Sequence, residues 1–481
     1  MDEYLKKIND LCLNAAEKRV SLQTDFLHLK YHALADDLNL TIPVLENFLF
    51  ALSLFKTRTV ENIHKAKALV EKLLHFASSD GQFPVYLHEY PECKDHYLAI
   101  SLIAPLYWIY KDFHQILGNP LRQRLEKALL ELVNYSVKIS TEKTPPYFMR
   151  IRLASALQAV GNLFNLEGLK IDGEKRLLEF NDVTRDWFIP KHLSDLIIAS
   201  QMADMKFSQK FLDHLNKTWH PDLNCYAGPT ILEYQAGFEP EVTLYDLFMG
   251  YLTKKFSKRA LTFNVVHLHA ALIQPCEYKI DNHLPLIWQG KINAQSYNCF
   301  KAEHYNFAFI EQDSNKASQD KGFAPYKLNF GNVDRLHSLT IEAPNSQKIA
   351  FTEQQKTHEF LFSLAEVPEF EDKEKCREVA FYFDIFDKTD VRIEGIKATT
   401  FQIGEKFEVV LDGFKFDLLF EIVKGSGHFM GHFMRGNRPS QIANKGKDRF
   451  AAFDYQVFLR TIRRDTDCII KATLTLHEEV F

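Results

Sequence analysis

A histidine, an asparagine and two tyrosines follow one another within fifteen residues of the chain. They are His220, Asn224, Tyr226 and Tyr234. Phenol and imidazole groups can exchange protons with a substrate, and an amide or imidazole can neutralise a neighbouring carboxylate. These are the group types that β-elimination of a uronic acid requires, so we predict a catalytic role for all four. The alternative is an ordinary polar and aromatic loop between two helices.

A second group of acid, imidazole and phenol side chains follows the turn Asp80–Pro84, where no helical periodicity buries it. Its members are Tyr86, His88, Glu89, Tyr90, Asp95 and His96. We expect His88, Glu89 and Tyr90 to bind substrate. Glu89 and Asp95 could also supply the carboxylate pair of a glycoside hydrolase, although the spacing does not fix their distance. The alternative is a solvated loop.

A third group, Glu303–Asn306, opens a predicted strand. His304 is a predicted catalytic residue and Tyr305 a predicted substrate-binding residue. Both roles require that this strand start reaches the loops of the preceding helices, where the two parts would share a cleft. The alternative is a strand edge with ordinary polar residues.

A glycine-rich segment, Gly425–His432, holds two histidines. His428 and His432 are four residues apart, which places them on one face of a strand. Two imidazoles could ligate zinc, but no third ligand follows nearby, so no metal is expected. Beyond them, Arg435 and Arg438 could meet a carboxylate or a phosphate, and we predict that Arg435 binds substrate.

Four short motifs of well-known enzyme classes are absent from the sequence: GxGxxG, GxxxxGK[ST], HExxH and GxSxG. Their absence disfavours dinucleotide enzymes, P-loop ATPases, zinc peptidases of the HExxH type and α/β-hydrolases. No cofactor is expected.

Composition and charge exclude further classes. The 481-residue chain has a net charge of −5 and a pI of about 6.4, without the basic stripe of a nucleic-acid binder. Its seven cysteines are scattered without a CxxC pair, which indicates free thiols. The N-terminus lacks the apolar core of a signal peptide, and no run reaches the roughly 18 apolar residues of a membrane span. We expect a cytoplasmic protein with no nucleic-acid or membrane partner.

The elements that must position these residues change character near residue 275. Before that point, apolar residues recur at helical spacing, as in Val60–Phe76. Ten helices are expected: Tyr4–Arg19, Pro43–Phe55, Val60–Phe76, Asp95–Phe113, Leu121–Ser140, Tyr147–Phe164, Pro190–Met202, Ser208–Thr218, Val242–Leu252 and Ser257–Ile273. After Pro275, short alternating runs such as Phe414–Val423 predict antiparallel strands, interrupted by long loops at Asp313–Asn329 and Gly436–Asp448. We therefore expect an α+β protein with a helical domain, 1–275, and a β-sandwich domain, 276–481.

Polar–Gly–aromatic connections such as Asp80–Phe83 and Asn224–Pro229 join the expected helices. A ring of helical hairpins with such connections, followed by antiparallel strands, resembles polysaccharide lyases of the heparinase II/III or alginate-lyase type. That resemblance implies an incomplete (α/α) toroid joined to a C-terminal β-sandwich. Two features differ from the group: an export signal is missing, and neither Glu303–Tyr305 nor the pair His428 and His432 closely fits its histidine-rich strand.

Two hypotheses for function follow. The first is a carbohydrate-active protein, a carbon–oxygen lyase that acts on an oligosaccharide or polysaccharide by Tyr/His acid–base chemistry in a cleft between the two domains; glycoside hydrolysis is its second choice. The alternative is a non-enzymatic scaffold that holds a protein or glycan on its concave helical surface or β-domain. The oligomeric state cannot be inferred from the sequence.

Overall fold

The structure is a computed structural model. It describes residues 2–30, 40–180, 182–205, 208–229, 243–261, 266–276, 278, 280, 283–292, 295–313, 323–333, 336–343, 345–354, 356–367, 377–383, 390–411, 414–435 and 455–478. The chain folds into two compact units. The helical unit comprises Met1–Leu215 and Val242–Ile280, and the β unit comprises Asn216–Glu241 and Asp281–Phe481. The chain last passes from the helical unit to the β unit after Ile280, close to the expected boundary after residue 275. The segment 216–241, expected in the helical domain, instead belongs to the β unit.

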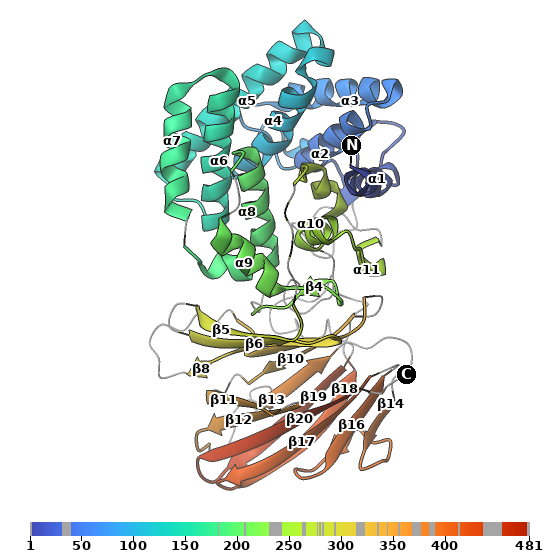
Figure 1. Ribbon diagram of the computed structural model, residues 1–481, viewed down its shortest axis with the longest axis vertical. Coiled ribbons are helices and arrows are strands. Elements are labelled where there is room, and N and C mark those ends of the chain that lie inside the picture. The colour runs from blue at the N-terminus through green and yellow to red at the C-terminus, as the bar shows by residue number, and fades with distance from the viewer. Residues whose placement is uncertain are drawn as a thin grey trace. The chain divides into compact units, whose positions relative to one another are not determined.

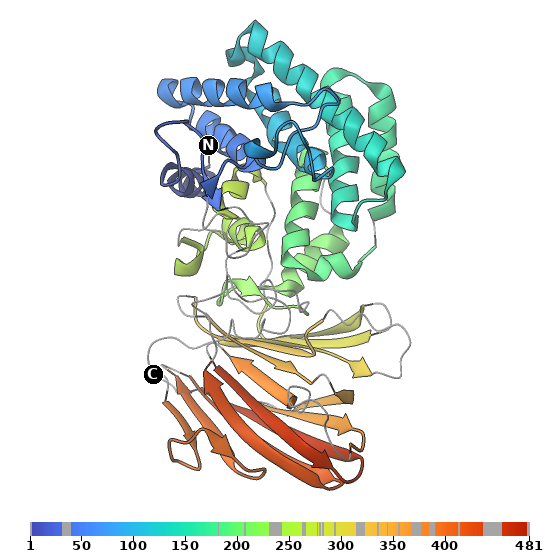
Figure 2. The same cartoon turned by 180° about the vertical axis from the view of Figure 1, so that it is seen from behind.

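The helical unit is a succession of antiparallel hairpins, coloured from blue to green in Figures 1 and 2. Its longer helices are α1 (Glu3–Glu17), α2 (Val44–Thr57), α3 (Val60–Leu73), α4 (Leu98–Leu117), α5 (Asn119–Glu142), α6 (Tyr147–Phe164), α7 (Glu167–Leu177), α8 (Pro190–Met202), α9 (Gln209–Thr218) and α10 (Leu244–Thr253). Two short ones, α11 (Lys258–Leu261) and α12 (Val266–His269), and a 3₁₀ turn η5 (Ala270–Leu272) follow.

The packing of the helices runs around a ring. The hairpins α2/α3, α4/α5 and α6/α7 each pack together, and α2, α4, α6, α8 and α10 touch one another in that order. Helix α12 packs on both α10 and α2, which closes the ring. The helices differ in burial: α2 and α4 are apolar on nearly every side, whereas α3 buries only one stripe. The expected toroid of helical hairpins is confirmed.

Helix α7 was missing from the sequence-based expectation. Only Gly173 and Leu177 are buried in it, so it carries no apolar stripe that a periodicity search could detect. Its position depends on close backbone approach to α6. A Cβ atom at Gly173 would lie 2.4 Å from the Gln158 backbone nitrogen, and one at Gly161 would lie 2.5 Å from that of Lys170. Close backbone packing at these two glycines, rather than an apolar stripe, therefore holds α7 against α6.

The described part of the β unit contains two large antiparallel sheets. The nine-stranded sheet has the order β15-β18-β19-β13-β10-β9-β7-β6-β5, and the seven-stranded sheet has the order β14-β16-β17-β20-β12-β11-β8. The strands of the first are β5 (Leu286–Ile292), β6 (Gln295–Lys301), β7 (Tyr305–Ile310), β9 (Tyr326–Gly331), β10 (Leu336–Glu342), β13 (Arg377–Phe383), β15 (Thr400–Phe401), β18 (Gly427–Arg435) and β19 (Tyr455–Arg464). Those of the second are β8 (Gln312–Asp313), β11 (Ser346–Gln354), β12 (Thr357–Leu364), β14 (Asp390–Ile393), β16 (Lys406–Leu411), β17 (Phe414–Lys424) and β20 (Cys468–Glu478).

An aromatic core joins the two sheets. Phe330 of β9 stacks on Phe414 of β17 with ring centroids 4.4 Å apart. The alternation expected in β17 is confirmed, since Phe414, Phe416, Leu418 and Phe420 are all buried. The expected loop Asp313–Asn329 was wrong at its end, because Tyr326 and Leu328 are completely buried and belong to β9. Their alternation with polar residues was visible in the sequence but too short to stand out from the polar run before it.

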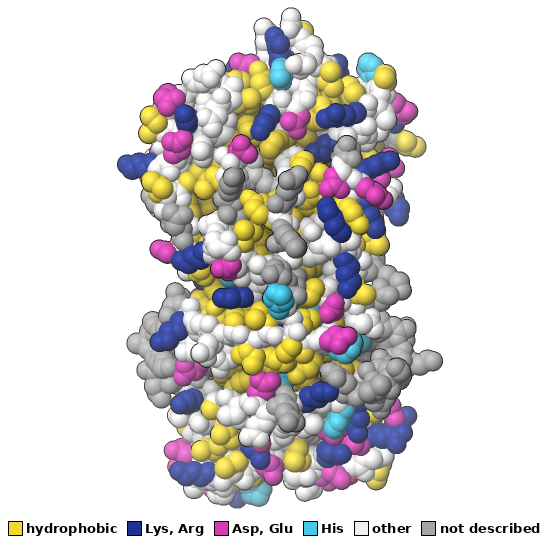
Figure 3. Space-filling view, in the orientation of Figure 1, with side chains coloured by type: hydrophobic (Ala, Val, Ile, Leu, Met, Phe, Trp, Pro, Cys, Tyr) yellow, Lys and Arg dark blue, Asp and Glu magenta, His cyan; other side chains and the backbone are white. Residues whose placement is uncertain are grey.

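Charged side chains of both signs are interspersed on the face drawn in Figure 3. No helix in the described part of the chain is long and apolar enough to cross a bilayer.

Candidate functional site

The predicted catalytic loop forms a small hairpin of the β unit. Strands β3 (Trp219–His220) and β4 (Cys225–Tyr226) pair antiparallel. Asn224 turns the chain between them with φ +48°, a left-handed conformation that Asn tolerates better than most residues. His220, Asn224 and Tyr226 are all buried, at 0%, 3% and 8% exposure. The fourth residue of the prediction, Tyr234, lies outside the described residues.

Both ring nitrogens of His220 are hydrogen-bonded. Its Nδ1 accepts from the backbone N–H groups of Asp222 and Leu223, at 3.3 and 3.1 Å. Its Nε2 therefore carries the proton and donates to the Ala302 carbonyl oxygen at 2.6 Å. Burial lowers the pKa of His220 to about 4. The ring thus holds the hairpin to the end of β6 as a neutral histidine.

Lys301 makes a second connection between the hairpin and β6. Its side chain is completely buried, and its Nζ donates to the carbonyl oxygens of Asn216 and Trp219 at 2.6 and 2.8 Å. Burial lowers the pKa of this lysine to about 8. The lysine therefore satisfies two carbonyls where α9 ends and β3 begins, which would otherwise be buried without donors.

Two asparagines of the sheet extend this buried polar layer. Asn329 on β9 donates to the Tyr226 carbonyl oxygen at 3.2 Å and to Asn306 Oδ1 at 3.0 Å. Asn306 on β7 donates to Cys225 Sγ at 3.5 Å. The Tyr226 hydroxyl itself donates to the Pro229 carbonyl oxygen at 3.0 Å. The described polar groups of the predicted loop are thus largely engaged in docking it to the sheet.

The structure brings the first and third predicted groups to the same end of the β unit. The hairpin bonds to Ala302 and Asn306, on either side of His304 and Tyr305. Tyr305 is buried, and its ring lies 5.4 Å from that of Phe300. The His304 side chain is 51% exposed, with Nε2 3.8 Å from Glu303 Oε1. His304 is therefore the accessible titratable side chain of the two.

The second predicted group lies in the helical unit. His88 is exposed, and its Nδ1 lies 2.7 Å from Thr41 Oγ1. Glu89 Oε2 accepts from the Tyr86 backbone N–H at 3.4 Å, and its other oxygen lies 3.8 Å from Lys94 Nζ. Tyr90 is 44% exposed and its ring meets that of Phe76 edge-on at 5.6 Å. These contacts order a surface turn, consistent with the solvated-loop alternative.

Arg435 ends β18, where its backbone pairs with Tyr455. Its side chain and all of Arg438 lie outside the described residues.

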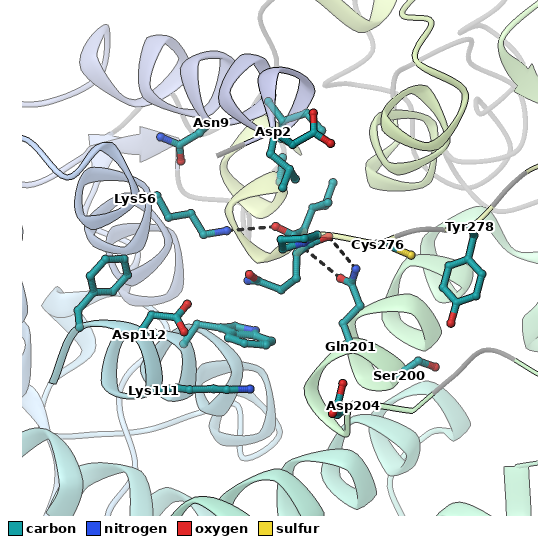
Figure 4. A pocket seen from close by; sticks show the side chains of 18 of the residues that line it. Asp2, Asn9, Lys56, Lys111, Asp112, Ser200, Gln201, Asp204, Cys276 and Tyr278 are labelled. Atoms are coloured by element: carbon teal, nitrogen blue, oxygen red, sulfur yellow. Dashed lines mark hydrogen bonds between the residues drawn. The ribbon is translucent and has the colours of Figure 1, made fainter.

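A cavity that the sequence did not predict lies in the helical unit (Figure 4). Its volume is about 1200 Å³. Helices α1, α2, α4 and α8 and the segment after η5 line it with acidic, basic and amide side chains, which include Asp2, Asn9, Lys56, Arg58, Lys111, Asp112, Gln201, Asp204 and Gln274. Gln201 fixes the segment by donating to the Gln274 carbonyl oxygen at 3.0 Å and accepting from the Gln274 backbone N–H at 3.2 Å.

Lys56 and Asp112 extend from α2 and α4 into this cavity (Figure 4). Lys56 Nζ donates to the carbonyl oxygens of Ala271 and Ile273, at 2.6 and 3.1 Å. Loss of solvation lowers the pKa of Lys56 to about 8, although the Asp112 charge opposes this shift. Loss of solvation also raises the pKa of Asp112, against the opposing charges of Lys56, Lys111 and Arg58. Each group therefore titrates closer to neutrality than usual, as proton-transfer groups do.

Lys111 supplies another fixed charge. Its Nζ lies 4.8 Å from the centre of the Trp108 ring and 5.4 Å from that of Tyr107. Cation–π attraction to two rings restrains the ammonium at the cavity wall. Sequence patterns gave no signal for the cavity residues, because they come from four helices and from the segments next to them, which are far apart in the sequence.

No protein-family profile matches the chain, and no curated protein matches it. Solved structures do resemble it. A xanthan lyase from Paenibacillus aligns with a TM-score of 0.54 and 8% identity over 99% of this chain, which spans 57% of that protein. The chondroitin AC lyase of Streptomyces coelicolor A3 aligns with a TM-score of 0.48 and 8% identity, over 100% of this chain and 80% of the lyase. A heparinase III aligns with a TM-score of 0.42 and 9% identity, over 98% and 84%.

Identities this low concern the fold alone, and the xanthan lyase match carries that comparison. The expectation of a polysaccharide-lyase-like fold, with a helical N-terminal half and a C-terminal antiparallel β region, is confirmed.

Proposed function

We propose that this protein is carbohydrate-active: it binds an acidic oligosaccharide in the helical-unit cavity and cleaves it as a carbon–oxygen lyase. One observation carries the proposal. Lys56, with a pKa of about 8, and Asp112, with a raised pKa, line one cavity together with the further cations Arg58 and Lys111. The lyase-like fold supports the substrate class.

The chemistry assigns a role to each charged group. Arg58 and Lys111 would pair with the uronate carboxylate and stabilise the charge that develops on it. The Asp112 carboxylate would accept the proton from the carbon next to that carboxylate. The C–H electron pair would form the new C=C bond as the C–O bond breaks, and the Lys56 ammonium would protonate the departing oxygen. Subsequent proton exchange with water restores both groups.

Proton transfer by Tyr226 and His220, as the sequence suggested, would require these buried groups to leave their hydrogen bonds. The proposal therefore places proton transfer in the helical-unit cavity. His304, whose side chain is half exposed in the β unit, has no role in the proposed reaction.

A panel of uronate-containing polysaccharides tests the lyase activity through the ultraviolet absorbance of the unsaturated product. We expect Asp112→Asn and Lys56→Gln each to lower kcat by about 100-fold or more, the size of a general acid–base contribution. The rate should fall above pH about 8, as Lys56 loses the proton it donates. Asp25→Asn and Lys65→Gln, which alter exposed residues on the outer surface, are the matched controls.

A binding measurement separates recognition of the substrate from its cleavage. Arg58→Gln and Lys111→Gln should each weaken the binding of a uronate oligosaccharide, measured by calorimetry, by about tenfold, the effect of roughly 1.4 kcal/mol. The proposal would be overturned if every polysaccharide of the panel gave no product and showed no binding.

The second candidate is a non-enzymatic interaction protein that holds a glycan or a protein. It is favoured by the hairpin that contains the predicted catalytic residues, because His220 and Tyr226 donate their protons to main-chain carbonyls of the β unit. Tight binding without product, equal in wild type and Asp112→Asn, would favour this candidate over the lyase.

A further inference from the structure

Strand β18 carries a repeated His-Phe-Met sequence. Residues 427–435 read GHFMGHFMR. Phe429 and Phe433 pack against the aromatic core of the sandwich. Because side chains alternate along a strand, His428, Met430, His432 and Met434 share the opposite face. From the sequence, no metal was expected at His428 and His432, and the proposed function does not use this row.

The two methionines of this face are unusually exposed for apolar side chains. Met430 is 44% exposed and Met434 is 48% exposed, on either side of His432. A methionine thioether is a soft, polarisable ligand on a chain with three rotatable bonds, so its sulfur can adjust to a neighbour. Residues two apart on a strand lie about 6.5 Å apart along the chain. Both sulfurs can therefore fold toward the ring between them.

The two histidines of the row differ in what they contact. His428 Nε2 accepts from the Arg463 guanidinium at 3.1 Å. His432 stacks on Phe458 of β19 at 5.2 Å, and its Nε2, although shielded from water, has no hydrogen-bond partner among the described residues. A shielded imidazole nitrogen without a partner costs free energy unless something else satisfies it. His432 thus offers a ligand atom, whereas His428 is engaged.

We propose that Met430, His432 and Met434 bind one soft monovalent ion, Cu(I) or Ag(I), through one imidazole nitrogen and two thioether sulfurs. Soft thioether ligands select Cu(I) over the hard divalent ions. The charge of Arg460, which pairs with Met430 across β18 and β19, favours the same choice, because its repulsion of a divalent ion would be twice as large. The described residues hold no group of three or more His, Cys, Asp or Glu suited to a metal ion, so the site depends on sulfur from methionine.

Methyl spectroscopy tests the proposal directly. The protein is labelled with ¹³C at its methionine methyl groups, its thiols are blocked with iodoacetamide, and silver nitrate is added in a chloride-free buffer. We expect the methyl signals of Met430 and Met434, assigned with Met430→Leu and Met434→Leu, to shift together and saturate at one ion. Met205 is the internal control, since it is 40% exposed but lies elsewhere in the chain.

Matched histidine variants then identify the nitrogen ligand. His432→Gln should weaken silver binding at these two methyl groups at least tenfold, whereas His428→Gln should leave it within twofold. Unshifted signals of the other methionines show that each variant is folded. Unmoved Met430 and Met434 signals at saturating silver, or equal effects of His428→Gln and His432→Gln, would overturn the proposal.

Discussion

Two lysines, Lys56 and Lys301, have the same chemistry and different surroundings. Each donates to two main-chain carbonyl oxygens, and burial lowers the pKa of each to about 8. Lys301 is completely enclosed in the β unit, while Lys56 lines a cavity of about 1200 Å³ in the helical unit. A perturbed pKa therefore indicates burial, and access to a ligand decides whether it can serve chemistry. Two histidines differ in access in the same way: His220 is fully buried, whereas the His304 side chain is half exposed.

The largest expected effect on stability comes from the replacement of Lys301. Lys301→Met removes both donors from the carbonyls of Asn216 and Trp219 and should lower the stability of the β unit by about 3 kcal/mol. Lys56→Met should cost about 1 kcal/mol, because water in the cavity can replace the lost donors. Hydrogen exchange of peptides from each unit measures the two effects separately, and the exposed Lys291→Met on neighbouring β5 is the control. Equal losses for Lys301→Met and Lys56→Met would remove the distinction.

The pH dependence of stability gives the next effect. The pKa of His220 is lowered from 6.5 to about 4, so between these values the unfolded chain binds a proton that the folded chain does not. Its contribution is therefore present above pH 6.5 and is lost as the pH falls toward 4, a loss on the order of 3 kcal/mol at most. His358, buried with a pKa of about 3, acts in the same direction.

Urea unfolding from pH 7 to pH 4 measures this loss. The change in the free energy of unfolding per pH unit should be smaller in His220→Gln than in the wild type, although His358 keeps this slope above zero. An unchanged slope in His220→Gln would show that the ring titrates normally in the folded protein.

The smallest effect is expected for His304, which lies two residues from the His220 acceptor. Its exposed side chain predicts a change in the free energy of unfolding below about 0.5 kcal/mol in His304→Gln. Should His304→Gln instead reduce product formation on a substrate of the wild type, the assignment of proton transfer to Lys56 and Asp112 alone would be wrong. Normal activity in this variant would leave the helical-unit cavity as the sole site of proton transfer.

The sequence alone determined the order of the elements. Helical spacing before residue 275 and alternation after it are local properties, so a helical half and an antiparallel β half were both predictable from them, whereas the toroid was implied by the resemblance to polysaccharide lyases. Helix α7 was not predictable, because Gly161 and Gly173 stabilise it through close backbone approach rather than through an apolar stripe. Whether His220 and Tyr226 share a site with the start of β7 could not be predicted from the sequence; in the structure their hairpin bonds to Ala302 and Asn329.

Only the tertiary structure decided what those residues do. A histidine in a polar loop has the same local sequence whether its nitrogens face water or two backbone N–H groups and a carbonyl, as those of His220 do. The cavity set was equally hidden, since Lys56 and Asp112 lie on different helices and come to one cavity only when α2 packs against α4. Local patterns report which face of an element is apolar, whereas solvation and proximity depend on contacts between distant segments, and these set the pKa values and the access that chemistry requires.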